Sequence, residues 1–207
     1  MSILTEFFTK QKQAATPQGE ASSVVSQVRG EEYADRNDYE LLPLLALRPW
    51  DYGRGVEDTT SGYGFTTPDG KIWAAHHCLW STWDELGVLV VNVVGESFHL
   101  EDLGDPDFDP GRPLQLVPEP ENPHDPNAIA VRNWTGDKTA GYIKRGSTSR
   151  LRNLLRGREL RVMSLSCWYD QPPPAGRRIS LTIAIFKPDR LLGADHVPPH
   201  PPAFDES

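Results

Sequence analysis

The feature that most constrains the fold is a series of short apolar runs in the second half of the chain. The runs are rich in β-branched residues, and turn residues such as Gly, Pro, Asn and Asp separate them. They occupy residues 88–94, 113–117, 128–132, 140–144, 160–168 and 178–186. Many short strands in close succession are typical of a small antiparallel barrel and not of a parallel sheet of alternating strands and helices.

One helix interrupts this series. Ser147 is a suitable N-cap, Leu151, Leu154 and Leu155 form an apolar face at helical spacing, and Gly157 is a stop signal. The sequence therefore predicts a mainly β protein. Its central unit is a small six-stranded SH3/OB-like barrel with one inserted α-helix, over residues 88–190.

The flanking segments are less regular. Residues 1–87 are expected to form an N-terminal extension of uncertain α+β character and unknown role, with a short helix within residues 2–15. Asp69-Gly70 predicts a hairpin turn between two short strands. This extension is either a separate small β unit or a segment packed on the barrel. Residues 191–207 contain several prolines and are expected to be a flexible tail that packs little.

Composition limits the cellular setting and the chemistry. The longest apolar run, residues 87–95, is too short to span a membrane, and no signal segment opens the chain, so a cytoplasmic protein without membrane contact is expected. Cys78 and Cys167 stand far apart and predict neither a disulfide framework nor a zinc site. No nucleophile elbow or phosphate loop appears, so no enzymatic activity and no cofactor are expected.

Two clusters suggest a metal site at first sight. Asp105, Asp107 and Asp109 have the spacing of calcium ligands, but Pro110 and Leu116 occupy positions where such a loop needs Gly and Glu. The acidic loop is therefore expected to be solvated. The run from His76 to Cys78 has no partner cluster at ligand spacing, so packing and surface contacts are expected there, and no metal is predicted.

Charge is distributed unevenly along the chain. The formal net charge is −8, but residues 138–161 contain eight basic residues and a single acid, Glu159. Because charges act over about 8 to 10 Å at ordinary salt, a local basic surface can attract an anion to an acidic protein. Arg150 and Arg152 within this segment are predicted to contact phosphates. The alternative is that they form the solvated face of the helix.

The segment NPHDPNA predicts a rigid loop. Pro123 and Pro126 each fix φ near −65° and favour extended conformations at the preceding residues, Asn122 and Asp125. Such a loop holds polar side chains in fixed directions for a ligand. In the alternative interpretation, Asn122 and Asp125 only accept hydrogen bonds from the amides of the loop.

Three segments together resemble the HIRAN domain, a family found in certain chromatin-remodelling helicases and in small bacterial proteins. The segments are VVGESFH from Val93, EPENPHDPNAIAV from Glu119 and AGYIKR from Ala140. The resemblance covers about residues 88–187 and implies a DNA-binding module that recognises the 3′-hydroxyl end of single-stranded DNA.

The resemblance also implies roles for individual residues. Phe98 corresponds to an aromatic position that stacks on a base, and Asp125 to the carboxylate that accepts from the terminal hydroxyl. Tyr142 and Arg145 correspond to strand positions that contact base and backbone. The predicted DNA-binding residues are Phe98, His99, Asn122, His124, Asp125, Tyr142, Lys144, Arg145, Arg150 and Arg152.

One segment departs from the helicase members of the family. They have an arginine and two aromatic residues after the VVG turn, whereas this chain has Ser97, Phe98 and His99. One phosphate contact and one ring are therefore changed, which is expected to weaken end recognition.

Two functions remain open. The first is DNA-end binding in repair, replication or DNA-related defence, with a helicase or another DNA-processing protein as a candidate partner. The second is a protein-interaction or regulatory module that has lost the DNA-end pocket.

Overall fold

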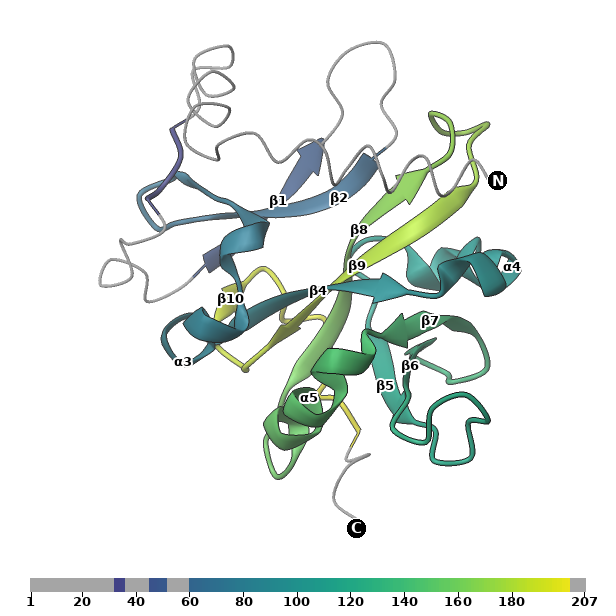
Figure 1. Ribbon diagram of the computed structural model, residues 1–207. Helices are drawn as coiled ribbons and strands as arrows, with labels where there is room; N and C mark the ends of the chain where they lie inside the picture. Colours follow the sequence, from purple (N-terminus) through teal and green to yellow (C-terminus); the bar gives the residue numbers. More distant parts are fainter. Residues whose placement is uncertain (1–31, 36–44, 52–59, 202–207) are drawn as a thin grey trace.

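The computed structural model describes residues 32–35, 45–51 and 60–201, and antiparallel strands dominate it (Figure 1). The strands are β1 (Leu45–Asp51), β2 (Thr60–Thr66), β3 (Ile72–Trp73), β4 (Val88–Val94), β5 (Leu114–Pro118), β6 (Ile129–Asn133), β7 (Thr139–Ile143), β8 (Arg161–Tyr169), β9 (Arg178–Phe186) and β10 (Leu191–Leu192). The α-helices are α3 (Trp83–Leu86), α4 (Leu100–Leu103) and α5 (Thr148–Leu155). The 3₁₀ helices are η2 (Ala75–His77), η3 (Trp80–Thr82), η4 (Glu96–Phe98), η5 (Pro106–Phe108) and η6 (Arg145–Ser147).

Six of the strands form the predicted barrel. They pair in the order β8, β9, β4, β7, β6 and β5, and each pairing is antiparallel. The segment before β5 closes the ring on β8, because Gly111 N–H donates to Ser164 O at 2.8 Å and Ser164 N–H donates to Arg112 O at 2.9 Å. The mainly β fold with a six-stranded barrel is therefore confirmed.

Helix α5 covers the barrel as its sequence predicts. Leu151, Leu154 and Leu155 are buried in the same apolar cluster as the inward side chains of the barrel strands. Ser147 occupies the N-cap position as predicted, but its side chain makes no capping hydrogen bond. Instead, the hydroxyl of Thr148 donates to Arg145 O at 2.9 Å. Arg145 and the helix are thereby held together.

The N-terminal extension continues the sheet of the barrel. Strand β2 pairs antiparallel with β8, and β1 and β3 both pair with β2. A second apolar cluster joins Phe65 and Trp73 of the extension to Met163 and Phe186 of the barrel. Strands β8 and β9 therefore bury side chains on both faces. Among the alternatives left open by the sequence, the structure has a segment packed on the barrel.

Asp69-Gly70 forms the predicted turn between β2 and β3. Thr67 N–H donates to Lys71 O at 2.9 Å across this turn, and Gly70 has a φ of 87°, which favours glycine. The helix predicted within residues 2–15 lies outside the described residues.

The C-terminal tail packs against the molecule as far as Pro201, contrary to the expectation. Strand β10 pairs with β1, and Leu191, Ala194 and Val197 are buried in the second apolar cluster. His200 N–H donates to Leu160 O at 2.7 Å, and the ring Nε2 of His200 accepts from Leu116 N–H at 2.8 Å. Apolar residues spaced between the prolines provide the packing surface that composition alone does not reveal.

A search of these described residues finds no helix that is both long enough and apolar enough to cross a membrane.

Candidate nucleic-acid interface

The turn after β4 holds an aromatic ring out to solvent. Gly95 adopts φ 80° in the left-handed region, and η4 follows it, with Phe98 N–H donating to Gly95 O at 3.1 Å. The Phe98 side chain is 87% exposed. The ring is therefore accessible to a ligand on a turn whose backbone is hydrogen-bonded.

Glu96 anchors the same turn from the inside. Its carboxylate is 8% exposed and accepts from the hydroxyl of Ser180 on β9 at 3.1 Å. Burial raises the pKa of Glu96 above its usual value, although hydrogen bonds from backbone N–H groups and from Ser180 act in the opposite direction. The turn thus has one side chain fixed in the barrel and one, Phe98, outside it.

Strand β7 lies beside this turn and contributes Tyr142. Tyr142 pairs with Val94 of β4, and its ring centroid lies 5.5 Å from that of His99. Gly141 permits this approach, because a Cβ there would lie 2.7 Å from Val93 Cγ1 and from Val94 O. The glycine that precedes Tyr142 in the motif is therefore needed because a larger residue would clash with β4.

Hydrogen bonds within the NPHD loop fix the position of its backbone, in keeping with the rigid loop that the prolines predict. Asn122 Oδ1 accepts from the N–H groups of His124 at 3.0 Å and Asp125 at 3.3 Å. Asn122 Nδ2 donates to Glu119 Oε2 at 3.0 Å. These contacts give Asn122 the loop-stabilising role of the alternative interpretation, while the His124 side chain is exposed.

Asp125 connects this loop to the end of β7. Its Oδ1 accepts from Asn127 N–H at 2.9 Å, and its Oδ2 lies 3.1 Å from Arg145 Nε. The Asp125 side chain is 16% exposed and that of Arg145 is 77% exposed. Lys144 is also exposed. The structure therefore links the two motif segments through an ion pair whose cation faces solvent.

Two further residues support the site and were missed from the sequence. Arg132 of β6 forms an ion pair with Glu119, with 2.6 Å between NH2 and Oε1. Burial raises the pKa of Glu119, but hydrogen bonds from Asn122 and Arg132 outweigh this effect and lower it overall. Burial and the Glu119 carboxylate raise the pKa of Tyr142. The position of Glu119 at the start of the NPHD segment was the available signal.

The basic segment 138–161 does not form one surface. Lys138 pairs with Asp105, and the Arg161 guanidinium donates to Ala194 O and Asp195 O, both at 3.4 Å. Strand β7 separates Lys138 from Arg145 by about 20 Å at roughly 3.3 Å per residue, which exceeds the screening length. The sequence sum therefore overstated the local charge.

The two arginines predicted to contact phosphates have different surroundings. Arg150 is exposed, and its guanidinium carbon lies 4.9 Å from the ring centroid of Trp80. Arg152 is half-buried, and its Nε has no hydrogen-bond partner among the described residues. Arg150 is thus accessible to a ligand, whereas Arg152 is partly covered.

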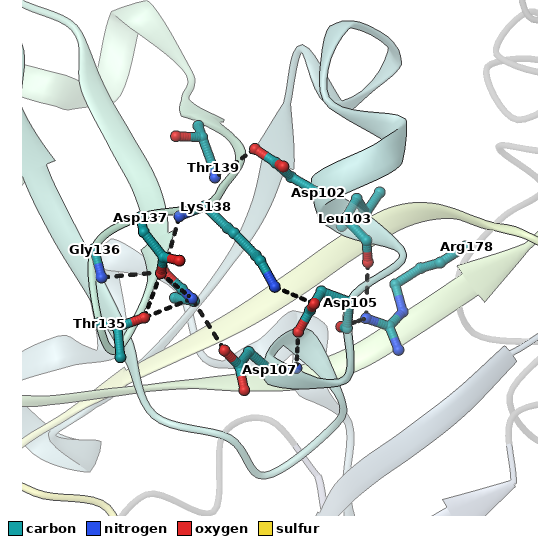
Figure 2. A network of polar contacts seen from close by, with 11 residues as sticks. Asp102, Leu103, Asp105, Asp107, Thr135, Gly136, Asp137, Lys138, Thr139 and Arg178 are labelled. Atoms are coloured by element: carbon teal, nitrogen blue, oxygen red, sulfur yellow. Dashed lines mark hydrogen bonds and ion pairs between the residues drawn. The ribbon is translucent and has the colours of Figure 1, made fainter.

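The acidic loop is bound to the barrel through its carboxylates (Figure 2), while Asp107 and the side chain of Asp109 remain exposed as expected. Its carboxylates each meet a donor from a strand or from a neighbouring turn. Asp102 accepts from Thr139 N–H at 3.0 Å, and Asp107 accepts from Asn133 Nδ2 at 3.0 Å. Asp105 pairs with Lys138, and Asp109 pairs with Arg178. The sequence did not reveal these contacts, because the donors come from distant parts of the chain.

The His76 to Cys78 run forms part of the packing between extension and barrel. The His77 and Trp73 ring centroids are 5.2 Å apart, and Cys78 is fully buried. Burial raises the pKa of the Cys78 thiol to about 12. The run lies on the 3₁₀ helix η2 and the residue after it, and it does not form a strand.

Comparisons with known proteins identify the barrel. Residues 86–186 match the HIRAN domain family. Among solved structures, the HIRAN domain of human HLTF is similar, with 21% identity, a TM-score of 0.32, and coverage of 50% of this chain and 78% of that chain. A Lactobacillus plantarum protein is similar with 24% identity, a TM-score of 0.31, and coverage of 47% and 91%. No curated protein matches.

The sequence match covers β4 to β9, which are the six strands of the closed barrel. The HIRAN family is known generally as a family of DNA-binding modules. The chain thus contains a HIRAN domain at residues 86–186, extended on one side by β1 to β3 and on the other by the packed tail.

Proposed function

We propose that this protein binds single-stranded DNA through its HIRAN domain and recognises the 3′-hydroxyl end of the strand. The observation that carries the proposal is the Phe98 ring, which is 87% exposed on a turn that Glu96 anchors from below. An aromatic face on a fixed support is the platform on which unpaired bases stack, and each stacked base contributes about 1 to 3 kcal/mol.

Charge near this platform supports the same ligand. Lys144 and Arg145 are exposed at the end of β7, the strand that brings Tyr142 beside the Phe98 turn. The protein as a whole has a net charge of −8, so a polyanion is attracted only where cations are locally in excess. The phosphates of a strand stacked on Phe98 are therefore expected to follow Lys144 and Arg145.

Asp125 supports recognition of the terminal hydroxyl. Its two oxygens are held by Asn127 N–H and Arg145, and each oxygen retains a lone pair that can accept from a hydroxyl. A 3′-phosphate would instead be repelled by the carboxylate. This function suits a protein that acts at DNA ends in repair, replication or defence, together with a helicase or another DNA-processing protein.

The test is a titration of the full chain with fluorescent single strands that carry free or phosphate-blocked 3′ ends, at two salt concentrations. Phe98→Ala is expected to weaken binding of both strands roughly 5- to 150-fold, the equivalent of one lost base stack. Leu192→Ala is the matched control, because Leu192 is an exposed apolar side chain on β10 at 51% exposure.

Two results would contradict the proposal. The first is equal affinity of the parent and Phe98→Ala for single strands. The second is no binding of the parent even at low salt, which would favour the protein-interaction module.

A further inference from the structure

A pocket with a volume of about 180 Å³ lies between the N-terminal extension and helix α5. Part of its wall comes from residues that precede the HIRAN match, so it is a joint product of extension and domain. The polar and aromatic residues that line it are Trp80, Trp83, Asp84, Arg150, Asn153 and Arg158.

The walls of this pocket are chemically mixed. The guanidinium of Arg150 lies over the Trp80 ring at 4.9 Å and also donates to Trp80 O at 3.3 Å, so both side chains are fixed. Arg158 adds a second cation, Asp84 an acceptor, and Asn153 an amide with both donor and acceptor. The pocket thus offers a flat ring, two guanidinium groups and a polar edge.

Trp83 adds a second, independent feature. Its side chain is 5% exposed, and its indole N–H has no hydrogen-bond partner among the described residues. A buried donor without a partner costs about 1 to 3 kcal/mol, and such groups call for an explanation in a native structure. Because this nitrogen is covered, a polar ligand in the pocket would reach it only after a shift of the wall.

We infer that this pocket binds one nucleotide of the DNA strand, at a position inward from the 3′ end. The inference rests on the proposed function and extends it to a second subsite. A nucleotide combines a planar base, which can stack on the guanidinium plane that Arg150 holds over Trp80, with a phosphate, which suits Arg158. The Asp84 carboxylate disfavours a bare anion but can accept from the amino group of a base.

The connection between the two sites supports a continuous path. Arg145 closes β7 and begins η6, which leads directly into α5, where Arg150 lies. At roughly 1.5 to 2 Å per helical residue, the Cα atoms of Arg145 and Arg150 are about 8 to 10 Å apart. A strand that leaves the end site past Arg145 therefore reaches the pocket within a few nucleotides.

The experiment follows the indole N–H signals of the six tryptophans by NMR in the ¹⁵N-labelled full chain. Trp80→Phe and Trp83→Phe assign the two signals. The ligands are deoxycytidine 5′-monophosphate, inorganic phosphate, a poly-glutamate peptide and a single strand of about 12 nucleotides. We expect the mononucleotide and the strand to shift the Trp80 and Trp83 signals in a saturable manner, and phosphate and peptide to leave them unchanged.

A matched pair of variants tests the assignment of the pocket. Arg158→Ala is expected to weaken binding of the mononucleotide roughly tenfold, the loss of one charge-assisted hydrogen bond. Arg156→Ala removes the same charge from the same end of α5, but Arg156 does not line the pocket, so its affinity for the mononucleotide is expected to equal that of the parent.

The outcomes separate this inference from the proposed function. If strands bind through Phe98 while neither tryptophan signal responds to nucleotide or strand, the pocket inference is wrong and the function stands. If the mononucleotide shifts the Trp80 signal while Phe98→Ala leaves strand binding unchanged, the end-binding function fails and the pocket stands. Equal shifts with inorganic phosphate, or shifts with poly-glutamate instead of nucleotide, overturn the nucleotide assignment.

Discussion

Lys138 and Arg145 flank the same short strand, β7, but only one of them is available to a ligand. At the start of β7, Lys138 pairs with Asp105 inside a network of acidic side chains (Figure 2). At the end of β7, Arg145 has a single carboxylate partner, Asp125, and remains 77% exposed. Equal charge in the sequence thus gives one structural residue and one candidate contact for DNA.

The difference lies in the number of partners that surround each end. Asn133 is fully buried and donates to Asp107, Thr135 and Asp137, so the polar groups at the start of β7 satisfy one another. At the other end, Phe98, Lys144 and Arg145 are exposed, and the half-buried His99 contacts the Tyr142 ring. Only side chains that are not occupied by hydrogen bonds within the protein are therefore available to bind a ligand.

The largest expected effect is a loss of stability when Arg178, which binds the acidic loop near the start of β7, is replaced. Its guanidinium is 5% exposed, donates to Leu103 O at 2.9 Å and Asp105 O at 3.0 Å, and pairs with Asp109. Arg178→Met leaves these acceptors without a partner, so the free energy of unfolding in urea is expected to fall by about 3 kcal/mol or more. The folded variant should bind DNA as the parent does.

Arg177→Ala is the control for Arg178→Met. The Arg177 side chain is 60% exposed, and its Nε lies 3.9 Å from Asp170 Oδ2. Exposed ion pairs of this kind contribute about 0 to 1 kcal/mol to the free energy of unfolding. Equal stability losses in the two variants would show that the acidic loop does not depend on its buried arginine.

Asp125→Ala tests the other end of β7, where Asp125 pairs with the exposed Arg145. Loss of a charge-assisted hydrogen bond to the terminal hydroxyl is expected to weaken binding of a 3′-hydroxyl strand about ten- to a hundredfold. A 3′-phosphate strand should bind the variant as well as the parent or better, because a repelling carboxylate has gone. Fluorescence anisotropy with both strands measures the difference.

Asp125→Asn controls for the structure of the loop, since its side-chain oxygen can still accept from Asn127 N–H. If Asp125→Ala binds the hydroxyl-ended strand as tightly as the parent, Asp125 only stabilises the loop and end recognition is refuted.

The two ends of β7 can be compared directly by removing one cation from each. Arg145→Ala is expected to weaken single-strand binding severalfold and to reduce the slope of log affinity against log salt by about 0.7, the value for one phosphate contact. Lys138→Ala removes the same charge and should leave the slope unchanged. Equal slopes for both variants would mean that only net charge matters.

Glu96→Gln should give the smallest effect, a change in the pH dependence of stability. Burial raises the pKa of Glu96 in the folded protein above its usual value of 4.5, so folding favours the protonated form. That contribution is complete below pH 4.5 and is lost as the pH rises through the raised pKa. Glu96→Gln lacks this decline, and urea unfolding at a series of pH values measures it; parallel curves for parent and variant would refute it.

Local pattern predicted the strands well, because strands that are buried on one or both faces carry dense apolar sequence. The strands Val88–Val94 and Arg178–Phe186 begin and end at the predicted residues. The local sequence pattern could not predict which distant segments pair with each other. The contacts of β2 with β8 and of Lys138 with Asp105 join residues far apart in the chain.

The candidate site was likewise predicted in part and missed in part. The NPHD and GYIKR segments lie together as the motif implies, joined by Asp125 and Arg145. Glu119 and Arg132 were missed because their role depends on a contact between two strands, β5 and β6, which pair side by side.

The contact of His200 with β5 affects how readily copies of the protein are expected to associate. Its ring takes up Leu116 N–H on β5, the last strand in the order of the sheet, while burial lowers the pKa of the ring and so favours the neutral form that can accept. An unpaired N–H on a terminal strand is a template for pairing with a strand of another molecule. A fragment ending at residue 190 lacks His200 and leaves Leu116 N–H without this partner, so the fragment is expected to self-associate.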